Sequence, residues 1–154
     1  MSDRNIFIVL ALVLVFLATG CTAEKFWWEK MKSTKLTQNN YKNYLGKDRY
    51  VFLEFYSKSC TYCEKLYPQL NKLVEEIEDG TFPRKDIVIA RIDGEEFPDL
   101  TDELGVDQFP TMYLYKPNDA TYPEKYDYNH KIQFIKGYLS SHPIAPKYAK
   151  GIVP

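Results

Sequence analysis

The run of residues 49–57 (RYVFLEFYS) is almost continuously apolar and rich in β-branched and aromatic side chains. Such a run predicts a strand that is covered on both faces, with Glu54 as the one charge inside it. After Cys60 the apolar positions recur at helical spacing as far as a break at Gly80. The pattern therefore predicts a buried strand followed by a long helix, which Pro68 should kink.

The rest of the chain continues this alternation. Residues 86–93 (DIVIARID) and 111–116 (TMYLYK) predict two further strands. Shorter patterns predict helices over residues 37–46, 98–105 and 131–139 and a fourth strand near an edge over residues 124–128. Alternating strands and helices predict an α/β fold in which helices cover both faces of one sheet. In such folds the working residues follow the carboxyl ends of strands, and Cys60 lies just after one.

The first residues follow a different pattern. Residues 6–18 (IFIVLALVLVFLA) are continuously apolar and follow Arg4. This predicts an export or anchoring signal rather than a core helix, because the segment has no polar face. Three outcomes fit: cleavage after Gly20 or Ala23, acylation of Cys21 in a loose bacterial lipoprotein box, or retention of residues 6–23 as a membrane anchor. Each outcome delivers the rest of the chain across or onto a membrane.

These patterns divide the chain into four parts. Residues 1–23 are expected to form the signal peptide or membrane anchor, and residues 24–34 (EKFWWEKMKST) a juxtamembrane spacer. The aromatic residues 26–28 fall where an interfacial belt would lie. The globular domain is expected over residues 35–139. Residues 140–154 are rich in proline, which predicts an extended or disordered tail.

Composition narrows the class of protein. The chain has 154 residues, 45% of them hydrophobic and 16% aromatic, so it can bury the core of a single domain. It has 20 basic and 21 acidic residues and no sustained basic run, so no nucleic-acid partner is expected. Its 3 cysteines are too few for a scaffold held together by disulfides. The close spacing of Cys60 and Cys63 therefore needs another explanation.

The C-x-x-C pair begins the predicted long helix. Cys60 is expected to be the nucleophile, because free N–H groups and the helix dipole stabilise a thiolate at a helix N-terminus. Cys63, one turn later, is shielded yet close enough to resolve a mixed disulfide. Glu54 is placed to accept the proton that Cys63 loses, since burial raises the pKa of a carboxyl group toward the working pH.

Other interpretations of these residues exist. A structural zinc site normally needs four ligands, and besides the pair the chain offers only Cys21, His130 and His142. No metal is therefore expected. The two cysteines of the motif also fit a buried core without chemistry, and Glu54 also fits an edge strand. The position of Glu54 six residues before the first cysteine of the pair favours the redox interpretation.

Residues 52–70 (FLEFYSKSCTYCEKLYPQL) resemble the active-site segment of the thioredoxin superfamily, and the form LEFY resembles its protein disulfide isomerase branch. The resemblance covers roughly residues 35–139. It implies a thioredoxin-like α/β fold with a central mixed sheet of four to five strands and helices on both faces. It also implies that Glu54 is the buried acid, Cys60 the nucleophile and Cys63 the resolving thiol.

The resemblance extends to two later segments. ARID, at residues 90–93, matches the segment that carries a basic residue near the buried acid, here Arg91. GVDQFPTMYLY, at residues 105–115, matches the loop with a cis-proline that faces the cysteines, here Pro110. The resemblance implies that Pro110, Phe109 and Tyr62 contact the substrate.

Four positions depart from the family pattern. Ser59 replaces the tryptophan usual before the first cysteine, and Thr61 with Tyr62 replaces the usual Gly-Pro or Gly-His dipeptide. The dipeptide tunes thiolate stability, so the resemblance does not set the reduction potential. His130 stands where the isomerase branch often has an arginine, and histidine titrates near neutrality. It also fits a surface residue before a helix.

The sequence thus predicts a thiol–disulfide oxidoreductase that acts on protein substrates with thiols or disulfides. No dissociable cofactor is expected, because the Cys60–Cys63 disulfide itself carries the two electrons. The expected location is the secretory pathway, the cell exterior, or a bacterial periplasm or membrane, rather than the cytosol. The alternative is a non-catalytic thioredoxin-fold subunit or chaperone-like module of a membrane-bound assembly.

Overall fold

Strands and helices alternate along the part of the chain that the structure, a computed structural model, describes, residues 25–149. The strands are β1 (Thr34–Lys35), β2 (Tyr50–Tyr56), β3 (Ile87–Asp93), β4 (Thr111–Tyr115) and β5 (Glu124–Lys125). The α-helices are α2 (Thr61–Glu78), α3 (Pro98–Glu103), α4 (Ile132–Ser141) and α5 (Pro146–Ala149). Two short 3-10 helices, η1 (Trp27–Lys30) and η2 (Tyr41–Asn43), precede β2.

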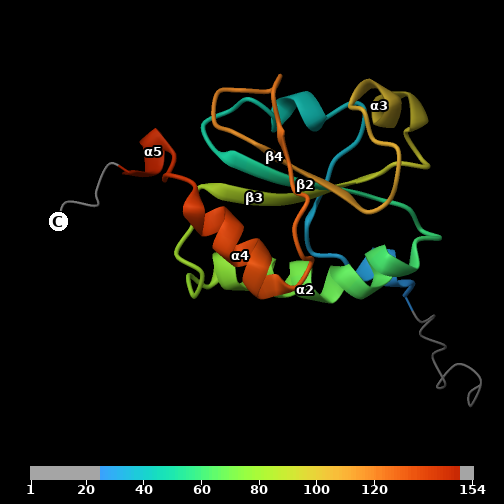
Figure 1. Ribbon diagram of the computed structural model, residues 1–154, viewed down its shortest axis with the longest axis horizontal. Helices are drawn as coiled ribbons and strands as arrows, with labels where there is room; N and C mark the ends of the chain where they lie inside the picture. Colours follow the sequence, from blue (N-terminus) through green and yellow to red (C-terminus); the bar gives the residue numbers. More distant parts are fainter. Residues whose placement is uncertain (1–24, 150–154) are drawn as a thin grey trace, which may run out of the picture.

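The strands form one mixed sheet in the order β1-β3-β2-β4-β5. The central strand β2 is parallel to β3 and antiparallel to β4. Helices lie on both sides of the sheet, with α2 and α4 on one side and α3 on the other (Figure 1). This architecture confirms the predicted α/β fold. It also explains why the sequence of β2 is almost continuously apolar, because all 7 of its residues are buried.

Successive residues of β2 point to opposite faces of the sheet. Tyr50 and Phe52 pack in a core cluster with α2 and α4. Leu53 and Phe55 pack in a second cluster with η2 and α3. Glu54 continues the first set, so its carboxyl group lies on the face that α2 covers.

Helix α2 carries the cysteine pair to this face. It begins after Cys60, which is its N-cap, and its buried side comes from residues spaced for one helical face, Cys63, Leu66, Leu70 and Leu73. Pro68 lies inside the helix. The chain leaves the helix through Gly80, whose φ of 83° favours glycine, at the predicted break.

The N-terminal part of the domain differs from the sequence-based boundary. The spacer predicted over residues 24–34 contains buried Met31 and Ser33, and Thr34 pairs with Ala90 in the sheet. Charged residues mixed with aromatic ones resemble a membrane-interface segment, but here η1 lies beside α2 (Figure 1). Trp27 and Trp28 pack against the buried cluster that contains Cys63. The domain therefore includes residues before Lys35.

The C-terminal part differs as well. An extended tail is expected over residues 140–154, but in its described part α4 continues to Ser141, α5 follows, and Ala145 is buried. The buried Arg84 donates hydrogen bonds to the carbonyl groups of Leu139 (2.6 Å) and His142 (2.8 Å). Because Arg84 lies far from residues 139–142 in the sequence, the local composition of the C-terminal segment does not reveal these hydrogen bonds.

The helix expected over residues 37–46 is shorter than predicted. Only Tyr41–Asn43 forms a 3-10 turn, although Tyr41 and Leu45 are buried in the same core cluster, as their spacing predicts. Gly46, with a φ of 66°, ends the segment.

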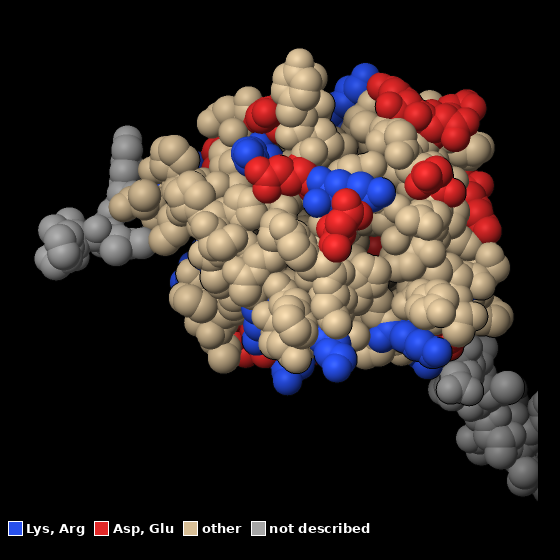
Figure 2. Space-filling view, viewed as in Figure 1, with Lys and Arg blue, Asp and Glu red and all other residues tan. Residues whose placement is uncertain are grey.

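Within residues 25–149, no helix is both long enough and apolar enough to cross a membrane. The predicted signal or anchor, residues 1–23, lies outside the described residues. Both signs of charge occur on the face that Figure 2 shows, and they are interspersed over its middle. Acidic side chains gather over α3, and basic side chains lie at the opposite edge of the same face (Figure 2).

Candidate active site

The cysteine pair lies where β2 gives way to α2. Cys60 and Cys63 form a disulfide, with their Cα atoms 5.2 Å apart. The backbone N–H of Cys63 donates to the Sγ of Cys60 at 3.0 Å, so a free helix N–H points at the first sulfur. Cys60 is partly exposed, whereas Cys63 is completely buried. The first sulfur can therefore meet a partner molecule, and the second cannot do so without movement.

The N-terminus of α2 favours negative charge on the first sulfur. Free N–H groups and the dipole of this 18-residue helix stabilise a thiolate at Cys60 when the disulfide is reduced. Burial disfavours the charged form of Cys63. The two thiols are thus chemically unequal, as an attacking and a resolving cysteine need to be.

Glu54 is buried beneath this region on the same face of the sheet. It is 1% exposed, and neither carboxylate oxygen receives a hydrogen bond from the described residues. Burial raises the pKa of Glu54 to about 8, although the nearby charge of Arg91 opposes the increase. A carboxyl group with this pKa exchanges protons near neutral pH, which suits a proton relay.

Arg91 lies next to Glu54 because the two residues are partners in the parallel pairing of β2 with β3. Burial lowers the pKa of Arg91. Its Nη1 donates to the carbonyl oxygen and, at 3.1 Å, to the Oγ of Ser33. Arg91 therefore places a positive charge near the buried acid and also holds the segment that precedes β1.

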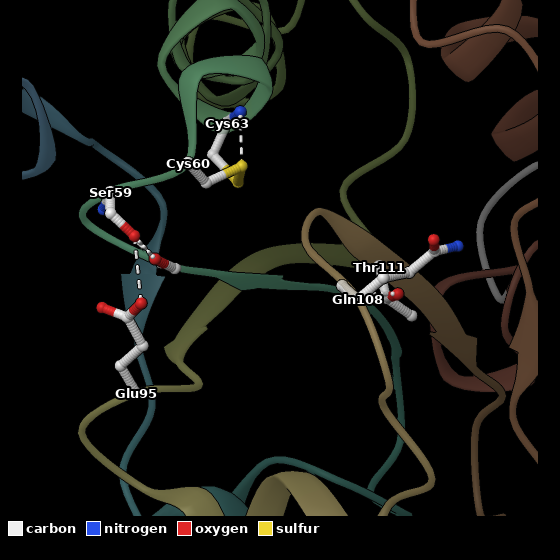
Figure 3. The surroundings of a disulfide bond; sticks show 7 residues. Ser59, Cys60, Cys63, Glu95, Gln108 and Thr111 are labelled. Atoms are coloured by element: carbon white, nitrogen blue, oxygen red, sulfur yellow. Dashed lines mark hydrogen bonds between the residues drawn. A yellow bond between two sulfur atoms is a disulfide. The ribbon is translucent and has the colours of Figure 1, made fainter.

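The loop before β4 contains the predicted proline. The peptide bond between Phe109 and Pro110 is cis, and the Thr111 hydroxyl group donates to the Gln108 carbonyl group at 2.8 Å (Figure 3). The Phe109 ring packs against the buried cluster that contains Cys63. It fits over Gly94, where a Cβ atom would lie 2.3 Å from the ring. The structure thus brings this loop to the cysteine pair.

A hydrogen-bonded chain lies on the other side of Cys60 (Figure 3). The Ser59 hydroxyl group donates to Glu95 at 3.0 Å and lies 2.8 Å from the Ser57 hydroxyl group. Lys58, in the same loop, forms an ion pair of 3.0 Å with the buried Asp93. These contacts hold the loop from β2 to α2. Ser59, in this loop, occupies the position at which the family usually has a tryptophan. The sequence shows the serine but not its partner Glu95.

The remaining predicted residues lie at the surface. Tyr62, in the first turn of α2, is 73% exposed, and the Lys65 ammonium group lies 5.7 Å from its ring centre. His130 is exposed in the loop before α4, with its ring 6.2 Å from that of Tyr126. The side chain is exposed overall, but partial desolvation lowers the pKa of His130. It is not a member of the buried cluster around Cys63.

The N-terminal residues that pack around the pair were not expected from the sequence. Met31, Tyr56 and Cys63 form one buried cluster, and Trp27 and Tyr67 pack against it. The aromatic stretch at residues 26–28 was the available signal, but its charged neighbours favoured a membrane-interface interpretation.

Comparisons with known proteins agree with this geometry. A family model described as Thioredoxin matches residues 32–140. The chain is 28% identical over 106 residues to Protein disulfide isomerase-like 2-1 of Oryza sativa subsp. japonica, covering 69% of this chain and 28% of that protein. It is 26% identical over 134 residues to Protein disulfide-isomerase of Oryctolagus cuniculus, covering 85% and 26%. The chain thus spans about a quarter of the length of these curated relatives.

Solved structures share the fold. The structure of human ERp44, form I, matches with a TM-score of 0.63 at 19% identity, covering 72% of this chain and 29% of that chain. The Trx4 domain of ERdj5 matches with a TM-score of 0.61 at 16% identity, covering 72% and 95%. The strand order, the cysteine pair at the start of α2 and the family match lead to one conclusion: the chain belongs to the thioredoxin family.

Proposed function

We propose that this protein is a thiol–disulfide oxidoreductase of protein substrates, of the protein disulfide isomerase kind. The observation that carries the proposal is the disulfide between a partly exposed Cys60 and a completely buried Cys63 at a helix N-terminus. Similarity to Protein disulfide-isomerase of Oryctolagus cuniculus supports it.

In the reductive direction, the Cys60 thiolate attacks one sulfur of a substrate disulfide. A Cys60–substrate disulfide forms, and the first substrate thiolate leaves and takes a proton from water. Cys63 then gives its proton to the Glu54 carboxylate and attacks the Cys60 sulfur, which expels the second substrate thiolate. The substrate ends as a dithiol and the enzyme as a disulfide, so two electrons pass from enzyme to substrate.

The reverse sequence oxidises a substrate dithiol and leaves both enzyme cysteines reduced. In either direction the surface beside Cys60 must hold an extended polypeptide in the mixed disulfide. We assign Phe109, Pro110 and the exposed Tyr62 to this substrate-binding surface. The Phe109 ring packs at the cysteine cluster, and Tyr62 lies two residues after Cys60, in the first turn of α2. Arg91 and His130 are proposed to modulate proton transfer.

The compartment is also a proposal. The apolar residues 6–23 predict delivery across or onto a membrane, and thus a secretory or extracytoplasmic location in which disulfides persist. Membrane association through this segment is part of the same proposal.

The proposal is tested by disulfide exchange between the full-length protein and a disulfide-bonded peptide, with glutathione as the redox buffer. Cys60→Ser should abolish turnover, and Cys63→Ser should accumulate a mixed disulfide with the peptide, because attack remains but resolution is lost. Unchanged turnover in Cys60→Ser would refute the proposal. Intact folding without any exchange in the unaltered protein would favour the non-catalytic subunit.

A further inference from the structure

Residues 26–33, here called the strap, run along α2 before the chain enters β1, with contacts from Tyr67 to Glu75. The strap contains η1 and lies beside the end of α2 that carries the cysteines (Figure 1). Its apolar side faces inward, since Met31 is 6% exposed, while Lys32 next to it is exposed. The strap is therefore a packed part of the domain at the redox site.

Aromatic contacts join the strap to the surroundings of the resolving cysteine. The Trp27 ring is stacked on that of Tyr67 at a centroid distance of 5.7 Å, and it meets the Tyr56 ring edge-on at 5.9 Å. Tyr56, Met31 and Cys63 form the buried cluster against which Trp27 packs. Cys63 is 0% exposed, and the strap supplies part of the apolar wall around it.

Polar contacts fix the strap at two points. The side chain of Asn71, on α2, accepts from the Lys32 N–H at 2.7 Å and donates to the Lys30 carbonyl group at 2.8 Å. These two hydrogen bonds hold the backbone on both sides of Met31. Beyond it, Ser33 accepts hydrogen bonds from Arg91, the neighbour of Glu54. The strap is thus tied both to the cysteine helix and to the residues of the buried acid.

We infer that the strap is a positioning element of the redox pair, with Trp27 as its positioning residue: it excludes water from Cys63 and so keeps Cys60 the reactive thiol. The inference rests on the proposed function, because that function assigns the roles of attacking and resolving thiol. If the strap loosened, water would reach Cys63, its thiolate would become easier to form, and the distinction between attacking and resolving thiols would weaken.

The test follows the reactivity of Cys63 alone. Full-length protein with Cys21→Ser and Cys60→Ser keeps Cys63 as its single thiol, and its alkylation by iodoacetamide is measured across a range of pH. Adding Trp27→Ala should raise the rate about tenfold and move the pH profile to lower pH. Trp27→Phe keeps a ring and should restore the parent behaviour.

Asn71→Ala provides an independent route, because it frees the strap backbone without altering an aromatic ring. It should change the reactivity of Cys63 in the same direction as Trp27→Ala. The matched control is Ile135→Val in the core beneath α4, which costs stability away from the strap and should leave the pH profile unchanged.

If both strap variants fold, judged by circular dichroism, and both keep the parent rate within about twofold, the inference is refuted. The single-thiol protein cannot turn over, so this result does not depend on whether the natural pair exchanges disulfides. Failure of exchange in the unaltered protein would instead count against the proposed function alone.

Discussion

Glu54 is a buried carboxyl group whose pKa lies well above its ordinary value. It is a carboxyl group with no hydrogen-bond partner among residues 25–149, buried in the central strand with one nearby positive charge from Arg91. Burying such a group without a hydrogen-bond partner costs folding free energy. Natural proteins retain such a cost mainly at functional sites. The proposed purpose of Glu54 is proton exchange with Cys63.

The stability of the protein should depend on pH through Glu54. Its pKa is about 8 in the folded protein and near the ordinary 4.5 in the unfolded chain. Between these values the folded state holds a proton that the unfolded state releases. This contribution to stability is therefore fully present below pH 4.5, declines progressively as pH rises above 4.5, and is lost as pH passes through 8. Glu54→Gln should therefore stabilise the protein by on the order of 3 kcal/mol at pH 7 and little near pH 4.5.

Urea unfolding of both proteins with the disulfide intact, at several pH values, measures this difference. A gain that is the same at every pH would contradict the assigned pKa. In the exchange reaction, Glu54→Gln should slow release of the mixed disulfide by about a hundredfold and remove its increase with pH near 8. A release rate that still increased with pH would show that another group accepts the proton.

Gly94 allows a second prediction for a single residue. Its missing side chain leaves room for the Phe109 ring, since a Cβ atom there would lie 2.3 Å away. Gly94→Ala should displace the loop of the cis-proline, destabilise the domain by about 1–3 kcal/mol, and reduce exchange with peptides more than exchange with glutathione.

Gly137→Ala is the matched control, because Gly137 lies in helix α4 with nothing within 4 Å of an added Cβ atom. It should stabilise the domain by about 0.5–1 kcal/mol and leave both exchange rates unchanged. Equal losses of peptide and glutathione exchange in Gly94→Ala would contradict the assignment of this loop to the substrate-binding surface.

The sequence predicted the cysteines, Glu54, Arg91 and the loop of Pro110 because these residues sit in strong local patterns or match a family motif. It could not predict that Glu95 pairs with Ser59 or that Asn71 holds the strap. Each of these contacts joins positions 36–41 residues apart in the chain and leaves no periodic trace.

At the scale of elements, predictability follows the strength of the hydrophobic pattern. β2 is a long, nearly continuous apolar run and α2 has a long apolar pattern at helical spacing, so both lie where expected. β1 has only 2 residues, and α5 has 4, too few for any period to appear. These short elements are held by contacts with distant residues, which is why the spacer and the tail were placed outside the domain.

The C-terminal segment allows a direct test of that explanation. Arg84 is bonded to both carboxylate oxygens of Asp86, which also accepts the Ala145 N–H at 2.8 Å. Burial opposes ionisation of Asp86, but the hydrogen bonds prevail and its pKa is lowered. Arg84→Leu would leave this carboxylate buried without its partner and should cost about 3–5 kcal/mol.

The variant should also open residues 140–149 to limited proteolysis while the cysteine pair stays protected. Lys85→Leu is the control, because Lys85 is exposed and its loss should change neither stability nor cleavage appreciably. The double variant Arg84→Leu with Asp86→Leu should recover part of the stability. Unchanged cleavage of the C-terminal segment in Arg84→Leu would show that other contacts hold it.

For the molecule as a whole, the redox pair, the buried acid and the strap occupy one end of the domain. The described chain begins at residue 25, just before the strap, so the predicted signal or anchor adjoins the segment that packs around Cys63.

The proposed function depends on Cys60 and Cys63 forming a reversible redox couple. The most direct measurement is its reduction potential in the full-length protein with Cys21→Ser, equilibrated with reduced and oxidised glutathione and trapped by alkylation. We predict a single two-electron transition between about −270 mV, as for thioredoxin, and about −180 mV, as for protein disulfide isomerase. If the cysteine pair neither changed its redox state with the glutathione ratio nor exchanged disulfides with glutathione, the proposed redox couple would be contradicted.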